Sequence, residues 1–118
     1  MTTEELKERT KQVALRIVRL TSSLPNTREA DVIGRQLLRS GTSVGANYRA
    51  ACKARSRADF INKIGIVEEE ADESMYWLEL LIASDIVKTE LLNPLLSEVK
   101  ELTAIFTASG RTAKRNRL

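Results

Sequence analysis

The sequence has 118 residues, which suffices for one domain built on a single hydrophobic core. It contains only two Pro, five Gly and 4% aromatic residues, a composition typical of an all-α protein. The single cysteine excludes an internal disulfide, the N-terminus is charged, and no apolar run reaches the roughly 20 residues of a membrane span. We therefore expect a cytoplasmic protein without a membrane segment.

The net charge of +3 is unevenly distributed along the chain. Residues 28–63 carry a net charge of +5, residues 64–110 carry −8, and residues 111–118 carry +4. Such asymmetry suits an anionic partner, or it is self-complementary between helices or subunits. Both explanations stay open at the level of sequence.

The first predicted helix covers about residues 3–22. Its apolar positions recur at alternating steps of four and three, which keeps their side chains on one helical face. These positions are Leu6, Thr10, Val13, Ile17, Leu20 and Leu24. Thr2 or Thr3 is suited to cap the start, and Pro25 breaks the pattern, so a tight turn is expected there.

The second predicted helix begins near Thr27, capped by Asn26 or Thr27. The run Ser40-Gly41-Thr42-Ser43 allows a kink or a separate turn, and we favour one long helix. Gly41 lies in its interior, although a Gly costs about 1 kcal/mol relative to Ala in a helix. Small residues form one surface that would let a neighbouring helix approach closely. They are Gly41, Gly45, Ala46, Ala50, Ala51 and Ala54.

The third predicted helix begins after Ser56, which with Asp59 resembles a capping box, and runs to about Ala83. Its core stripe is Phe60, Ile64, Val67, Ala71, Met75, Leu78 and Ile82. A second stripe lies beside the first and consists of Ile66, Glu70, Glu73, Trp77 and Leu81. Two stripes predict that this helix has more than one neighbour.

A connection of about nine residues is expected from Ser84, because Asn93-Pro94 is typical of a helix start. The fourth predicted helix then stops at Gly110, a residue favoured just after helix ends. Residues 111–118 have no apolar face, so we expect a bundle of residues 1–110 followed by a disordered basic tail. The short connections predict antiparallel neighbours, and hence an all-α, up-down four-helix bundle.

The chain contains no His, which removes the commonest general base and a common metal ligand. A di-iron site in a bundle requires Glu-x-x-His pairs, so the carboxylates of residues 68–73 do not fit one. We expect no catalytic residues, no metal, no cofactor and no enzymatic activity. Glu70 and Glu73 share a stripe with Trp77, so we expect them to be partly buried and paired with basic groups. The candidate partners are Arg49, Arg55 and Lys63.

Basic side chains gather at the predicted corner between the second and third helices, and again in the tail. The corner group is Arg49, Lys53, Arg55, Arg57 and Lys63, and the tail group is Arg111, Lys114, Arg115 and Arg117. Either group suits phosphate contacts or an ion-paired, solvated surface. Tyr48, Tyr76 and Trp77 fall on the predicted buried stripes, so no aromatic platform for stacking bases is expected. Sequence-specific base reading is therefore disfavoured.

Three segments carry a resemblance to a known family. They are SVGANYRAACKARS at residues 43–56, DFIxK at 59–63 and EEAxExxYWLELL at 69–81. Together they closely resemble the bacterial four-helix-bundle family of the 23S rRNA intervening-sequence protein. The positions that match its recurring motif are Asn47, Arg49, Arg55, Lys63, Glu70, Glu73, Tyr76 and Trp77, and most of them suit folding or ring assembly equally well. The candidates for a structural or interface role are Asn47, Tyr48, Glu70, Glu73, Tyr76 and Trp77.

The resemblance implies a left-handed bundle that assembles into a ring-shaped homopentamer. It also implies kinship with the accessory variability determinant of diversity-generating retroelements, a basic pentamer that binds nucleic acid and a reverse transcriptase. A net charge of only +3 is lower than a strong nucleic-acid binder would carry.

Two hypotheses follow for the role of such an oligomer. In the first, repeated basic patches bind RNA or DNA, and avidity turns weak phosphate contacts into useful affinity. In the second, the ring is a structural adaptor for a protein partner, and its basic and acidic surfaces meet each other at subunit interfaces. Steep salt dependence of nucleic-acid binding distinguishes the first from the second.

Overall fold

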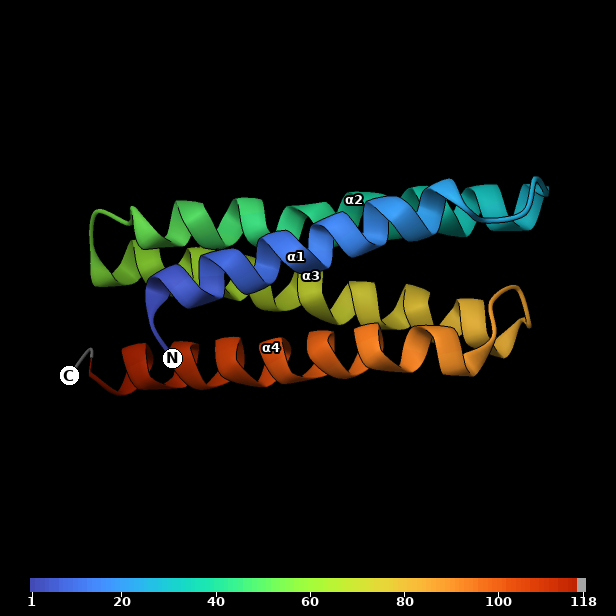
Figure 1. Ribbon diagram of the computed structural model, residues 1–118. Helices are drawn as coiled ribbons and strands as arrows, with labels where there is room; N and C mark the ends of the chain where they lie inside the picture. The colour runs from blue at the N-terminus through green and yellow to red at the C-terminus, as the bar shows by residue number, and fades with distance from the viewer. Residues whose placement is uncertain (117–118) are drawn as a thin grey trace.

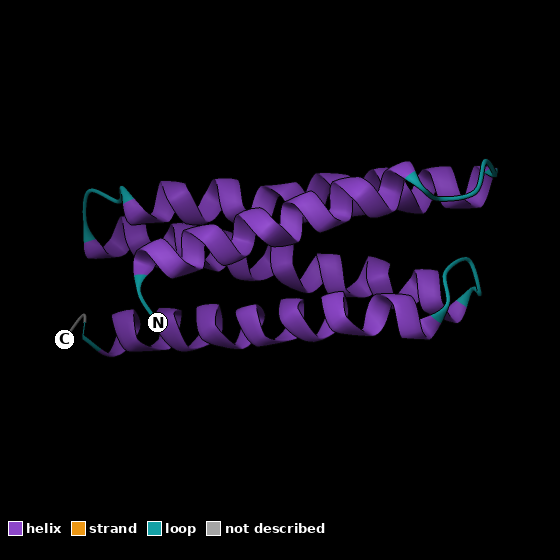
Figure 2. Ribbon diagram, viewed as in Figure 1, coloured by secondary structure: helices purple, strands orange, loops and turns teal. Residues whose placement is uncertain are grey.

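The computed structural model describes residues 1–116 and folds them into four α-helices (Figure 1). They are α1 (Thr3–Ser22), α2 (Arg28–Cys52), α3 (Arg57–Ala83) and α4 (Thr89–Arg115). Each helix runs antiparallel to the one before it, and the rod measures 50 × 21 × 21 Å. In the described part, short turns and the chain ends make up the rest (Figure 2). The expected all-α, up-down four-helix bundle is confirmed.

Side-chain caps fix the starts of the first three helices. The hydroxyl oxygens of Thr2, Thr27 and Ser56 each accept a hydrogen bond, 3.1 Å long, from the backbone N–H three residues later. Each bond satisfies one of the N–H groups that a helix start leaves without a partner. The bounds of α1 and the long, uninterrupted course of α2 agree with the sequence analysis.

The fourth helix begins earlier than the sequence suggested. It starts at Thr89 rather than at Asn93-Pro94, so the connection after α3 is shorter than the expected nine residues. Pro94 lies on an exposed side of the second turn, where the carbonyl that loses its N–H partner can face water. Burial of Leu92 and Leu95 stabilises the turns on either side of it. Tertiary packing therefore outweighs the usual position of proline.

The expected helix end at Gly110 and disordered tail were also wrong for residues 111–115. Gly110 has no positive φ angle, and α4 continues through it to Arg115. A Cβ built on Gly110 would lie 3.5 Å from the Ile64 side chain, so this glycine faces α3. Residues 117–118 of the expected tail, including Arg117, lie outside the described residues.

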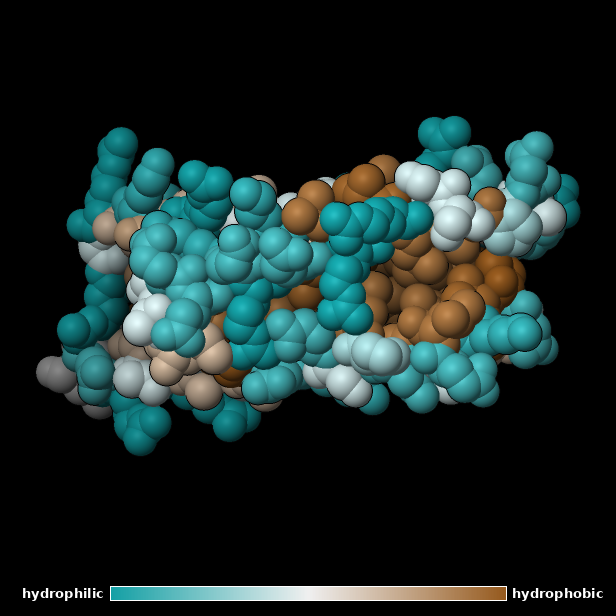
Figure 3. Space-filling model, in the orientation of Figure 1, coloured by the Kyte–Doolittle hydropathy of each residue, from teal (hydrophilic) through white to brown (hydrophobic). Residues whose placement is uncertain are grey.

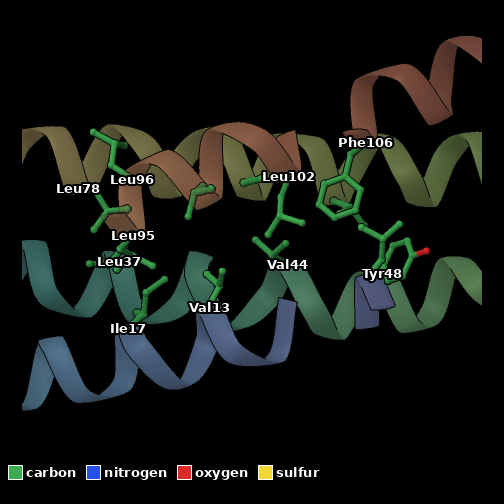
Figure 4. Packing of buried hydrophobic residues seen from close by; sticks show 14 of the residues in the cluster. Val13, Ile17, Leu37, Val44, Tyr48, Leu78, Leu95, Leu96, Leu102 and Phe106 are labelled. Carbon is green, nitrogen blue, oxygen red and sulfur yellow. The ribbon is translucent and has the colours of Figure 1, made fainter. Parts of the chain in front are cut away.

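The core runs along the axis of the rod (Figure 4). Ile17, Leu37, Leu78 and Leu102 are fully or almost fully buried, and together they join all four helices. A buried Ser40–Ser74 hydrogen bond of 3.0 Å links α2 to α3. Small residues let α1 approach α2 as expected, since a Cβ on Gly41 would lie 2.3 Å from Ile17 Cδ1.

The seam between α1 and α4 is the loosest of the four sides of the bundle. Arg9 of α1 holds it by a two-bond ion pair with Glu98 of α4, at 2.6 and 2.9 Å, and approaches Glu101 at 3.3 Å. The Glu98 hydrogen bonds raise the pKa of Arg9. Figure 3 shows apolar side chains gathered between α1 and α4 toward the turns at residues 23–27 and 84–88.

Candidate nucleic-acid interface

One end of the rod collects the basic groups that the sequence analysis placed in two separate sets. α2 ends there, α3 begins there, and α4 ends there (Figure 1). The guanidinium of Arg57, at the start of α3, donates a hydrogen bond to the backbone carbonyl of Asn116, just after α4. The corner group and the described part of the tail group therefore form one surface, which we call the basic end.

The basic end has five exposed cations. They are Lys53, Arg55, Arg57, Lys114 and Arg115. None of the five forms a salt bridge with a carboxylate among residues 1–116. Charged side chains that protein carboxylates do not neutralise remain available to phosphates.

Three other predicted cations have different surroundings. Lys63 donates to Asp59 at 3.1 Å, so its charge is locally balanced. Arg49 is exposed and lines a groove between α1 and α2. Arg111 is exposed on the outer side of α4, beside a groove between α3 and α4. These three flank the basic end and do not form its centre.

Asp59 organises the backbone at the corner of the basic end. Its Oδ2 accepts the backbone N–H of Arg55 at 3.1 Å as well as the Lys63 ammonium. These two donors, the Arg55 N–H first, lower the pKa of Asp59 below its ordinary value. The carboxylate thus fixes the turn that carries Lys53 and Arg55 without pairing with their side chains.

The expected partners of Glu70 and Glu73 were wrong. Arg39 of α2 holds both carboxylates, with a 3.2 Å bond to Glu70 and a second bond to Glu73. These hydrogen bonds, the one to Glu73 first, raise the pKa of Arg39. Sequence could not identify Arg39 as the partner, because the choice depends on the register between α2 and α3. Arg49 and Arg55 are left free for other roles.

The aromatic residues divide between core and surface. Tyr48 is buried against Phe106, with ring centroids 5.4 Å apart, and burial raises the pKa of Tyr48 to about 12. Trp77 is half-buried, but Tyr76 is 57% exposed, and the two rings pack in a T-shaped arrangement with centroids 4.9 Å apart. The expectation that Tyr76 is buried was wrong, because it lies at the edge of the second stripe, on the side turned away from α2.

The remaining predicted structural residue, Asn47, serves its own helix. Its side-chain amide donates to the carbonyl of Ser43 at 2.9 Å, one turn earlier in α2. Among residues 1–116, no group of three carboxylate or cysteine side chains is arranged to hold a metal ion. None of the four helices is long and apolar enough to cross a membrane.

These features define a class of protein, an up-down four-helix bundle with a basic end. The sequence model of the 23S rRNA-intervening sequence protein family matches residues 3–108, so the chain belongs to that family. It is similar to a crystal structure of a protein of unknown function from the S23 ribosomal protein family of Bacteroides thetaiotaomicron. The identity is 40% and the TM-score 0.86, over 94% of this chain and 99% of that one. No curated protein matches the chain.

Proposed function

We propose that this protein is a non-catalytic oligomer that binds nucleic acid through its basic end. In this proposal the oligomer is the ring-shaped pentamer that the family resemblance implies. The convergence of unpaired cations from α2, α3 and α4 on one end of the rod carries the proposal. Each copy then contributes a small set of phosphate contacts, and several copies in one particle multiply them by avidity.

RNA is the first ligand to test. The names of the family and of the similar structure refer to rRNA and to a ribosomal protein, respectively. The basic end has no exposed aromatic side chain among residues 1–116, since Tyr48 is buried and Tyr76 lies in an acidic part of α3. Backbone contacts without base stacking give affinity with little sequence preference.

The experiment is fluorescence anisotropy with a labelled structured RNA and a labelled duplex DNA at two salt concentrations. Light scattering on the same samples gives the mass of the protein particle. We expect micromolar or tighter binding that falls at least tenfold between about 50 and about 200 mM salt. Absence of binding at the lower salt concentration, from an intact oligomer, would refute the proposal and favour an adaptor ring that binds a protein partner.

A matched pair of variants locates the contact. Lys53→Glu with Arg55→Glu reverses two charges at the basic end, and we expect at least a tenfold loss of affinity and a shallower salt dependence. Arg28→Glu with Lys88→Glu makes the same change in charge at the opposite end of the rod, where both side chains are exposed. Equal losses in the two variants would show that binding follows net charge and not the basic end.

A further inference from the structure

The outer face of α3 is not covered by any other helix among residues 1–116. It consists of Gly65, Glu69, Asp72, Tyr76 and Glu79, whose steps of four and three keep them on one side of the helix. All except the half-exposed Gly65 are exposed, and none of the three carboxylates forms a salt bridge among residues 1–116. Tyr76 is the most exposed aromatic ring in the part of the chain that the structure describes.

Two properties of this face suit a protein surface and not a nucleic acid. A Cβ built on Gly65 would meet nothing within 4 Å, so packing within the chain gives no reason for a glycine in mid-helix, where it costs about 1 kcal/mol. A site without a side chain lets another backbone approach closely. The carboxylates beside Tyr76 would repel phosphates, so its exposed ring is suited to a basic or apolar protein surface.

A groove with complementary properties lies between α1 and α2. Its lining includes the small residues Ala14, Thr42, Gly45 and Ala46, and its three basic residues, Lys7, Lys11 and Arg49, outnumber its two acidic residues, Glu4 and Glu8. Neither Lys11 nor Arg49 forms a salt bridge among residues 1–116. Helical steps of three and four continue the α1 side to Val18 and the α2 side to Leu38, which are 42% and 38% exposed.

We propose that the outer face of α3 in one copy docks into the α1–α2 groove of the next copy of this chain. The two surfaces carry opposite charges, which favours contact between them over contact between two copies of the same surface. α1 and α2 together carry nine basic and five acidic residues, whereas α3 carries two basic and seven acidic residues. In that docking Glu69 lies nearest to Lys11, and Asp72 and Arg49 add opposite charges elsewhere on the same two surfaces.

The positions along the rod agree when two copies lie parallel. Gly65 is eight residues from the start of α3 and Gly45 is seven residues from the end of α2, so each lies about 11 Å from the basic end at about 1.5 Å per residue. Tyr76 and Leu38 lie about 28 and 21 Å from it. Helical side chains lean toward their own N-terminus, which brings the Tyr76 ring and Leu38 toward each other.

Parallel docking of two different surfaces is a head-to-tail contact, which closes into a ring when the rotation between copies permits. In such a ring, every basic end faces the same side of the particle. The inference rests on the oligomeric part of the proposed function and specifies its interface. Assembly is measured without nucleic acid, so a ring that fails to bind RNA refutes only the nucleic-acid proposal, and a monomer that binds RNA refutes only this one.

Charge exchange tests the interface, with particle mass measured by light scattering and folding by circular dichroism. We expect Glu69→Lys with Asp72→Lys, and separately Lys11→Glu with Arg49→Glu, to reduce the mass toward that of the monomer. All four changes in one chain should restore the oligomer. Glu29→Lys with Glu90→Lys, the control, should leave the mass unchanged. Wild-type protein that is monomeric, or variants that all keep the wild-type mass, would overturn the proposal.

Cysteine cross-linking tests the pairing of two different surfaces. In a Cys52→Ser background, one chain carries Gly65→Cys and another carries Ala46→Cys. On mild oxidation after the two are mixed and reassembled, we expect a covalent dimer, and we expect little or none from either chain alone. Equal dimer from a single chain would show a symmetric contact and would contradict head-to-tail docking.

Discussion

Gly41 and Gly65 lie in the interiors of neighbouring helices, yet their surroundings are opposite. Gly41, on the inner side of α2, is buried and leaves no room for a Cβ beside Ile17. Gly65, on the outer face of α3, has open space where a Cβ would be. Glycine therefore permits close helix packing at position 41, whereas at position 65 no contact among residues 1–116 requires a glycine.

Charged groups divide in the same way between the middle of the rod and its basic end. Arg39 is held by two carboxylates of α3. Arg55 and Lys53 have no such partner among residues 1–116. Internal pairing thus occupies the arginine in the middle of the α2–α3 seam, and the cations of the basic end keep their charge. The comparison teaches that the role of an arginine or a glycine here depends on which helix side it occupies.

The largest effect is expected at the buried glycine. Gly41→Ala should lower the free energy of unfolding by about 1 to 3 kcal/mol, because Ile17 must move in a packed core. Urea unfolding measures the change. Adding Ile17→Val removes the δ-methyl that clashes, so the double variant should be more stable than Gly41→Ala alone. Wild-type stability of Gly41→Ala would show that the α1–α2 approach is not tight.

The exposed glycine should respond to the same substitution with the opposite sign. Gly65→Ala should raise the free energy of unfolding by about 0.5 to 1 kcal/mol, because helix propensity improves and nothing within the chain obstructs the methyl group. The comparison requires samples of equal particle mass, checked by light scattering. A loss of stability in monomeric samples would mean that there is less free space around residue 65, on the outer face of α3, than the structure shows.

The paired arginine should matter for stability and not for nucleic-acid binding. Arg39→Met leaves Glu70 and Glu73 without a partner, so the thermal midpoint should fall at about 50 mM salt and fall less at about 500 mM. Arg35→Met, which removes a more exposed pair with Asp31, is the control and should change the midpoint less. Loss of RNA affinity in a folded Arg39→Met oligomer would contradict the division between middle and end.

The smallest effect concerns Asp59 and depends on pH. Because the folded state lowers its pKa, the carboxylate stabilises the fold above the ordinary aspartate pKa of about 4, and this contribution is lost as the pH falls through the folded value. Asp59→Asn should therefore be less stable than wild type at neutral pH, and the difference should shrink in acid. Unfolding by urea at several pH values tests this, and a constant difference would exclude the carboxylate as its cause.

The sequence predicted the helices best where a local pattern and a local cap agreed. Ser56 and Thr27 cap helices whose apolar positions follow at regular steps, so the starts of α2 and α3 and the end of α3 were predicted close to their final positions. Pro94 and Gly110 misled because each is usually a boundary residue. Here burial of Leu92 and Leu95 carries the helix past Pro94, and packing against Ile64 of α3 carries it past Gly110. Long-range burial decided those bounds, and a local pattern does not contain it.

Composition and periodicity by themselves determined that this protein is an all-α bundle with one acidic helix and two basic segments. The three-dimensional structure alone decided that those segments meet at one end, that Arg39 pairs with Glu70 and Glu73, and that Tyr76 is exposed. The physical reason is that helical periodicity fixes which residues share a face of one helix. Only packing between helices fixes the rotation and register that bring one face against another.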